Sequence, residues 1–144
     1  MKNNSIAFYT DISKKENLKI LQEASSVYQN TFLFFDTAVE KSSELRIPMI
    51  NSSCMWGYKG TLIVTDHIDL FEVLNIASDI KVFYAIDNDK NYKGNLLHIL
   101  SNCEKFNLVV KEENKNQYQR LFGKNIVINT YELFNQFIQE LSNE

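Results

Sequence analysis

Four short polar segments each follow directly after an apolar run of the chain, and carboxylates are frequent in them. They are Thr10-Asp11, Thr65-Asp66, Asp87-Asn88-Asp89 and Lys111-Glu112. The carboxyl ends of parallel strands meet at one edge of a sheet, and α/β proteins bind their ligands there, so we expect these segments to line one crevice. Their hydroxyl, carboxylate and ammonium groups would hold a small polar ligand by hydrogen bonds. The candidate ligand-binding residues are therefore Thr10, Asp11, Thr65, Asp66, Asp87 and Lys111.

Threonine, aspartate and asparagine are also the residues that cap helix starts, so capping is the competing interpretation. The pattern favours capping for Asp66, which stands directly before an apolar-periodic run, and leaves the two interpretations about even for Asp11 and Asp87. Trp56 lies in the glycine-bracketed turn 54–60 and is a further candidate. A tryptophan there is more often buried in the core than used as a ligand platform, and both roles stay open.

The stretch from Gly60 to Asp66 shows how such residues would be positioned. An apolar, β-branched run after a glycine predicts a strand buried on both faces, and the periodic run 68–77 predicts the helix that follows. The same alternation recurs, with further strands expected at 5–9, 31–35, 48–51, 79–86, 106–110 and 125–128. We predict an α/β fold, a doubly wound, mostly parallel sheet of six or seven strands with helices on both faces, hence Rossmann-like.

Three helix starts carry the capping-box pattern, in which one side chain caps the helix and a second, three residues on, reaches back. The pairs are Ser13 with Glu16, Asn114 with Gln117 and Asn129 with Glu132. Apolar stripes at helical spacing follow each of them, and Gly123 is expected to end the second helix.

Composition narrows the class of protein. The length of 144 residues predicts one domain over 1–144. The formal net charge of −3 argues against nucleic acid as a partner. No apolar run is long enough to span a membrane, so we expect no membrane and a cytoplasmic location. Cys54 and Cys103 lie far apart in sequence, and we expect neither a disulfide nor a metal site.

The usual cofactor motifs are missing. The stretch after Tyr9 reads Thr-Asp-Ile-Ser-Lys-Lys, without the glycine-rich fingerprint of NAD-binding proteins or the P-loop. His67 and His98 are isolated, so zinc is not expected, and there is no Gly-x-Ser-x-Gly elbow. The sequence predicts no cofactor and no metal.

Asp11, Asp66 and Lys111 follow predicted strands as the phosphorylation-site residues of response-regulator receiver domains do, which suggests a receiver domain as another interpretation. The match departs from that pattern in detail. There is a single acidic residue after the first strand, no hydroxyl residue near Ala85 and no proline after Lys111. This regulator is the third hypothesis for the function.

Several stretches together resemble the N-terminal Rossmann-like half of GT-B glycosyltransferase-like proteins, particularly those carried by tailed phages. They are Ile6-Ala-Phe-Tyr-Thr-Asp11, Asn51-Ser-Ser-x-x-Trp56 through to Ile63-Val-Thr-Asp66, Val82-Phe-Tyr-Ala-Ile-Asp87, and Leu108-Val-Val-Lys-Glu-Glu-Asn114 ahead of 118–122. The likeness covers most of the chain from Asn51 onward, and each piece is also a generic strand with its cap.

In that family the resemblance implies transfer of a sugar from a nucleotide donor to an acceptor held by the N-terminal half. Asp11 would be the position for acceptor binding or for the catalytic base. The 144 residues account for one half, so glycosyltransferase activity is expected only if another chain supplies the donor-binding half. The implied partners are a sugar or nucleotide-sugar, and for a phage protein the location is the host cytoplasm.

The alternative is a non-enzymatic interaction or structural module whose site has decayed. Met55, Trp56 and Tyr58 would then form an exposed apolar surface for a homodimer or a partner protein.

Overall fold

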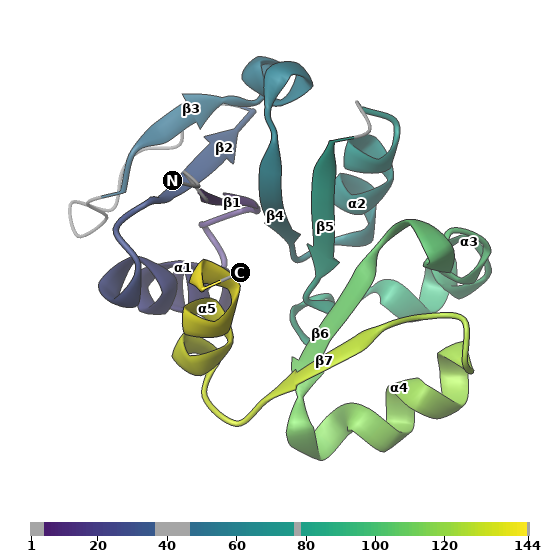
Figure 1. Cartoon of the computed structure of the whole chain (residues 1–144). Helices are drawn as coiled ribbons and strands as arrows, with labels where there is room; N and C mark the ends of the chain where they lie inside the picture. The colour runs from purple at the N-terminus through teal and green to yellow at the C-terminus, as the bar shows by residue number, and fades with distance from the viewer. Residues whose placement is uncertain (1–4, 37–46, 77–78, 144) are drawn as a thin grey trace.

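The seven strands form one parallel sheet (Figure 1). The computed structural model describes residues 5–36, 47–76 and 79–143, and over these residues the order is β3-β2-β1-β4-β5-β6-β7. The strands are β1 (Ile6–Tyr9), β2 (Thr31–Phe35), β3 (Met49–Asn51), β4 (Gly60–Val64), β5 (Ile80–Tyr84), β6 (Asn107–Lys111) and β7 (Ile128–Tyr131). The predicted Rossmann-like, doubly wound fold is confirmed.

The direction of winding reverses between β1 and β4. From β1 the chain adds β2 and β3 on one side, then returns across the sheet to place β4 on the other side of β1. The register aligns Tyr9 with Phe34 of β2 and with Val64 of β4, so the ends of three strands are level. In open α/β sheets this reversal leaves a crevice at the carboxyl ends of the strands.

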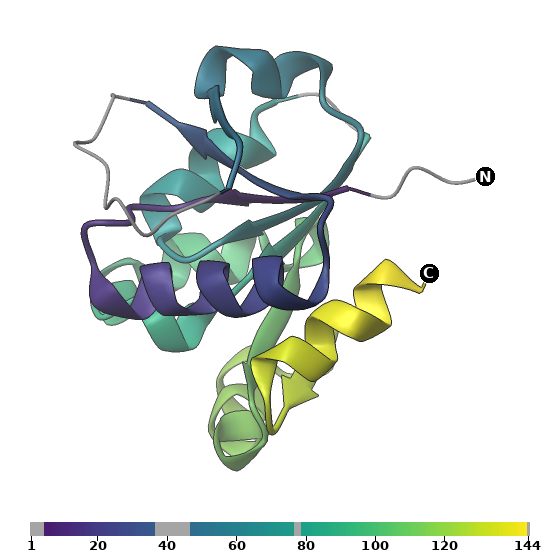
Figure 2. The same ribbon diagram turned by 90° about the vertical axis from the view of Figure 1, so that its left-hand side faces the viewer.

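Helices cover both faces of the sheet. α1 (Lys15–Val27) and α5 (Phe134–Ser142) lie side by side on one face. The other face carries α2 (His67–Leu74), α3 (Leu96–Ser101), α4 (Lys115–Phe122) and the 3₁₀ helix η1 (Ser52–Gly57). Figure 2 shows α1 and η1 on opposite sides of β1. Because both faces are covered, a central strand such as β1 is apolar along its whole length rather than alternating.

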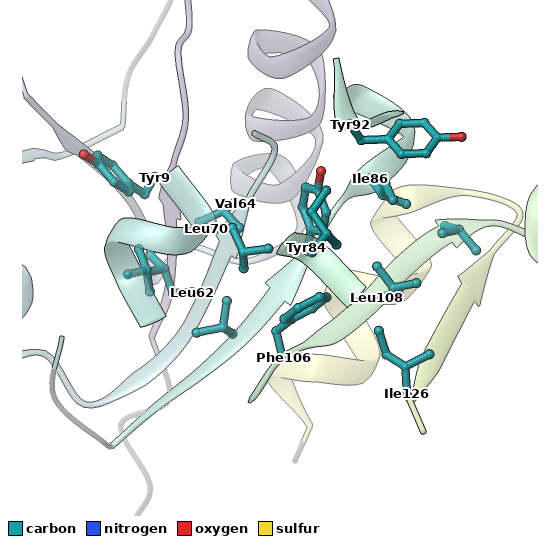
Figure 3. Packing of buried hydrophobic residues seen from close by; sticks show 14 of the residues in the cluster. Tyr9, Leu62, Val64, Leu70, Tyr84, Ile86, Tyr92, Phe106, Leu108 and Ile126 are labelled. Atoms are coloured by element: carbon teal, nitrogen blue, oxygen red, sulfur yellow. The ribbon is translucent and has the colours of Figure 1, made fainter. Parts of the chain in front are cut away.

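The core divides into one apolar cluster on each face. The larger cluster packs α2, α3 and α4 against residues such as Leu62, Tyr84 and Leu108, all fully buried (Figure 3). Tyr9 lies at the margin of this cluster, and its hydroxyl points away from it. The core therefore fixes the Tyr9 ring and leaves its polar end at the carboxyl edge. Within the described residues, none of the helices could cross a lipid bilayer.

The helix caps are only partly as predicted. Asp66 caps α2 as expected, its side chain accepting from the Ile68 amide at 2.7 Å. The three capping boxes are wrong. Ser13 donates to Asp11 instead of capping α1, Asn114 donates to Asp87, and Asn129 lies inside β7. In each case a tertiary or turn contact engages the side chain, so the helix starts without it. Gly123, at φ 69°, ends α4 as predicted.

The last strand and helix also begin later than predicted. The apolar run indicated a strand at 125–128, but pairing of Leu108 with Ile128 and of Lys111 with Tyr131 places β7 three residues further on. The helix expected from 129 begins at Phe134. The helix expected over 68–77 is shorter than predicted: α2 ends at Leu74 with Asn75 as its C-cap, and position 77 lies outside the described residues.

Candidate functional site

A hydrogen bond between two buried threonines joins the loops that follow β1 and β4. The hydroxyls of Thr10 and Thr65 are in direct contact, and both residues are almost fully buried. Asp11 and Asp66 follow them directly, so the predicted juxtaposition of these two strand ends holds. The threonine pair fixes the floor of the crevice at the point where the winding reverses.

Asp11 and Asp66 both have local backbone partners. Asp66 is the N-cap of α2. The carboxylate of Asp11 accepts from the Ser13 amide at 3.0 Å and from the Ser13 hydroxyl at 2.7 Å. The hydroxyl bond lowers the pKa of Asp11 below its ordinary value, because it favours the charged form. Asp11 is therefore an anion and a weak base at neutral pH.

A pocket of about 290 Å³ opens over the ends of β1 and β2, and we call it the β1–β2 pocket. Its polar lining includes the carboxylates of Asp11, Asp36 and Asp69, and among the described residues that line it there is neither lysine nor arginine. The remaining lining residues are Tyr9, Thr10, Ile12, Leu33, Phe34, Phe35 and Met49. The lining of the pocket is thus acidic, and part of it is aromatic.

The fold strongly changes the ionisation of Asp69. It lies in the first turn of α2 and is partly buried. Burial raises the pKa of Asp69 to about 7, and the negative charges of Asp66, Asp36, Glu72 and Asp11 add to the effect. A carboxyl group with a pKa near neutrality can take a proton from a ligand and give it back at physiological pH. Asp69 is therefore the best-placed base in the pocket.

The hydroxyl of Tyr9 lies between two of the neighbouring carboxylates. It is 2.7 Å and 2.8 Å from the two oxygens of Asp36 and 2.8 Å from Glu72 Oε2. Burial, followed by these hydrogen bonds, raises the pKa of Tyr9, so the hydroxyl keeps its proton. One proton satisfies one carboxylate at a time. The arrangement holds Asp36 and Glu72 close together at the wall of the pocket.

The same carboxylates include a set that could hold a metal ion. Asp36, Asp69 and Glu72 each offer an oxygen, and these atoms lie within 4.8 Å of one another. Oxygen ligands of this kind suit Mg²⁺ or Ca²⁺. Asp66, His67 and Asp89 form a second such group. In that group the His67 ring and the Asp89 carboxylate are already bonded to each other at 2.9 Å.

Asp87 and Lys111 lie together, but apart from Asp11. Asp87 accepts from the Lys111 amide at 2.8 Å, from Asn114 at 2.9 Å and from the Tyr118 hydroxyl at 2.9 Å. Asp87 and Lys111 line a different pocket of about 440 Å³, between α1 and the start of α5. The four predicted strand ends therefore do not line one crevice. The strand ends of β1 and β4 form one group, and those of β5 and β6 form another. The reason is that Asp87, after β5, is hydrogen-bonded to Lys111 of β6, to Asn114 and to Tyr118 of α4.

Trp56 is not the core residue that its sequence context favoured. Its side chain is 64% exposed, while the neighbouring Met55 is 1% exposed and belongs to the core. Trp56 lines a third pocket, which we call the Trp56 pocket, of about 340 Å³ beside Glu72 of α2. The sequence predicted an exposed apolar surface formed by Met55, Trp56 and Tyr58. This prediction is wrong for Met55, which is buried.

Sequence reasoning missed four residues of the β1–β2 pocket and its wall: Tyr9, Asp36, Asp69 and Glu72. Asp36 directly follows β2, so the rule that selected Asp11 would also have selected it. Asp69 and Glu72 are three residues apart on α2, which places them on one helix face. Nothing in the sequence pairs that face with Tyr9, since the contact arises from packing across the sheet.

Replacing Tyr9 by phenylalanine is expected to lower the free energy of unfolding by about 2 kcal/mol at pH 7. The two carboxylates then lose their shared donor, and hydrogen bonds to charged groups are the stronger ones. Urea unfolding measures the change. Tyr92→Phe is the matched control, because Tyr92 is also largely buried and its hydroxyl contacts the uncharged side chains of Gln117, at 3.4 Å, and Tyr118 instead of a carboxylate. Equal losses in the two variants would contradict the role of the Tyr9 hydroxyl.

In comparisons with known proteins, the chain matches no family model, no curated protein and no solved structure.

Proposed function

We propose that this chain binds a small, neutral ligand rich in hydroxyl groups, of the sugar class, in the β1–β2 pocket. The observation that carries the proposal is Asp69, a carboxyl group with a pKa of about 7 in the wall of a pocket at the reversal of the sheet. We further propose that Asp69 is the base toward one hydroxyl of that ligand. The chain would then be the acceptor-binding part of a glycosyltransferase.

The charge of the pocket supports a neutral ligand over an anionic one. Asp11 is ionised at neutral pH, and it lines the pocket together with Asp36 and Asp69. A phosphate or carboxylate group would be repelled by these charges at short range. Sugar hydroxyls, by contrast, donate hydrogen bonds that carboxylates accept. The aromatic and aliphatic lining, including Phe34 and Met49, suits the C–H surface of such a ligand.

The proposed chemistry follows from the position of the base. Asp69 removes the proton of the acceptor hydroxyl while its oxygen forms a bond to the anomeric carbon of a nucleotide-sugar. The bond from that carbon to the nucleotide phosphate breaks, and the nucleotide leaves with the electron pair. The nucleotide-sugar is the co-reactant and is bound by the donor-binding half. Asp69 suits this step better than Asp11, whose hydrogen bonds to Ser13 hold it in the charged, weakly basic form.

Calorimetric titration tests the proposal directly. The wild-type chain is titrated at pH 7.5 with methyl glucoside, methyl galactoside, N-acetylglucosamine and maltose, and separately with UDP and UDP-glucose. We expect heat from at least one neutral sugar and none from UDP. Asp69→Asn is expected to weaken sugar binding about tenfold, since a charge-assisted hydrogen bond contributes roughly 1.5 kcal/mol or more.

Asp79→Asn is the matched control, because Asp79 is an exposed carboxylate paired only loosely with Lys59 at 3.9 Å. This variant should bind the sugar as the wild type does. Absence of heat with every neutral sugar, or binding of UDP that Asp69→Asn strengthens, would refute the proposal.

A further inference from the structure

Among the described residues, Trp56 is the most exposed aromatic residue. Tryptophan is highly buried on average, yet 64% of this side chain is accessible. The reason is local. Met55 takes the buried position of η1 and belongs to the same apolar cluster as Phe34 and Leu70, so the adjacent residue is turned outward. The fold thus places a single indole on the surface next to α2.

The surroundings of this indole are polar. The Trp56 pocket is lined by side chains that carry amide, hydroxyl and carboxylate groups, and Ile76 adds an apolar contact. The polar members are Asn51, Ser52, Ser53, Glu72 and Asn75. Donors and acceptors therefore surround one flat apolar surface.

A protein partner fits this surface poorly. Met55 is in the core, and the hydroxyl of Tyr58 contacts the carbonyl oxygens of Ser5 at 3.1 Å and Thr61 at 2.9 Å, so that ring is held inward. Of these three side chains, the indole of Trp56 is the one that stays largely exposed, and the pocket beside it is lined mainly by polar residues. Stable protein interfaces bury roughly 800 Å² on each partner and have an apolar centre, which this surface does not offer.

A sugar ring matches it well. A pyranose has an apolar face of C–H groups that packs on an aromatic ring, and hydroxyl groups around its edge that need hydrogen-bond partners. We infer that Trp56 is a stacking platform for one ring of a carbohydrate, with the polar residues of the Trp56 pocket binding its hydroxyls. This inference rests on the proposed function, and it specifies the ligand class further.

The position of Glu72 connects the platform to the acidic site. Glu72 lines the Trp56 pocket and also contacts the hydroxyl of Tyr9, which lines the β1–β2 pocket. The two pockets therefore share one wall, formed by the Tyr9–Glu72 contact. A ligand with one ring at Trp56 and another near Asp69 must be an oligosaccharide or a glycoside with a ring-sized substituent. The preferred ligand is thus larger than a monosaccharide.

The chain contains one tryptophan and seven tyrosines, so emission excited selectively at the long-wavelength edge of the indole absorption reports on this site. The wild-type chain is titrated with maltotriose, cellotriose and chitotriose, and with methyl glucoside for comparison. We expect at least one trisaccharide to shift the emission to shorter wavelength and to bind several-fold more tightly than the monosaccharide. Calorimetry on Trp56→Ala should show trisaccharide binding weakened about tenfold, since aromatic stacking and ring burial contribute roughly 1.5 kcal/mol. Monosaccharide binding should be unchanged.

Leu97→Ala is the control, because Leu97 is an exposed apolar residue (84%) on α3. It should leave every affinity unchanged. If Asp69→Asn loses binding while Trp56→Ala binds trisaccharides normally, the platform is refuted and the proposed function stands. If Trp56→Ala loses binding while Asp69→Asn does not, the platform stands and the role of Asp69 is refuted. No change of emission with any trisaccharide also overturns the inference.

Discussion

Replacing Asp69 by asparagine should stabilise the protein above pH 7, by about 2 kcal/mol. The pKa of Asp69 is raised to about 7 by burial and by neighbouring carboxylates, whereas the pKa of an aspartate in an unfolded chain is about 3.9. The folded state therefore holds this proton more tightly than the unfolded state. The stability linked to Asp69 is full below about pH 4 and is lost as the pH rises through 7.

Asparagine has almost the same shape and cannot ionise, so the variant avoids that loss. One pKa unit corresponds to about 1.4 kcal/mol. The expected gain in the free energy of unfolding is smaller than the whole pKa shift of Asp69 implies, because the side chain retains contact with solvent. Thermal unfolding from pH 4 to pH 8 measures the effect. We expect a Tm about 6 °C higher than wild type at pH 8, and a difference that shrinks toward pH 4. A difference that is constant with pH would show that ionisation of Asp69 is not the cause.

The same variant connects stability to function. Under the proposed function, Asp69→Asn is both more stable at pH 8 and weaker in sugar binding. A charged group kept at a cost in stability is common at functional sites. The exposed carboxylate Asp79 provides the comparison, because Asp79→Asn should change neither property.

Replacing Asp89 by alanine should have the largest destabilising effect, a loss of roughly 3 kcal/mol or more in the free energy of unfolding. Asp89 is 4% exposed. Its Oδ2 accepts from the His67 amide at 2.9 Å, contacts the His67 ring at 2.9 Å and accepts from the Tyr84 hydroxyl. Its Oδ1 accepts from the Asn91 amide at 3.0 Å. Alanine would leave these buried donors without a partner.

The hydrogen bonds around Asp89 also determine where the protons of His67 and Tyr84 lie. With Asn95 donating to His67 Nε2 at 2.9 Å, the ring proton lies on Nδ1 and is donated to Asp89. Burial and the bond to Asp89 raise the pKa of Tyr84, so this hydroxyl remains a donor. The network joins the start of α2 to the end of β5, and it therefore supports the helix that carries Asp69 and Glu72.

Urea unfolding tests this prediction, with Asp89→Asn as the conservative variant and Asp79→Ala as the exposed control. Asparagine keeps one acceptor oxygen, so its loss should lie between those of the wild type and alanine. Asp79→Ala should change stability by less than about 0.5 kcal/mol. A loss below 1 kcal/mol for Asp89→Ala would mean that the donors of His67 and Tyr84 find other partners.

Local features of the sequence were enough to predict most of the sheet, the N-cap of α2 and the end of α4 at Gly123. Apolar runs bounded by turn residues located six of the seven described strands, β1 to β6, because a strand buried on both faces must be apolar along its length. Asp66 was recognised as a cap because its partner, Ile68, is two residues away. The parallel, doubly wound order followed from the alternation of strands and helices.

Residues whose roles depend on distant partners were not predictable in this way. The start of β7 is set by pairing with β6, and this overrode the local apolar run at 125–128. Ser13, Asn114 and Asn129 are residue types that cap helices. Each of their side chains instead makes a hydrogen bond within a turn or to a distant residue. Lys111 ends β6 and Asp11 follows β1, and these strands are not neighbours in the sheet, so the two residues line different pockets.

The fold class and the edge of the sheet at which polar residues gather can both be inferred from the amino-acid sequence, because they follow from periodicity and from the ends of strands. Which of these residues form a site depends on how the helices pack on the sheet. Asp36 directly follows β2, while Asp69 and Glu72 lie on α2, and packing brings the three carboxylates together beside the Tyr9 hydroxyl of β1. Their mutual repulsion and burial, which set the pKa of Asp69, exist only after the chain has folded.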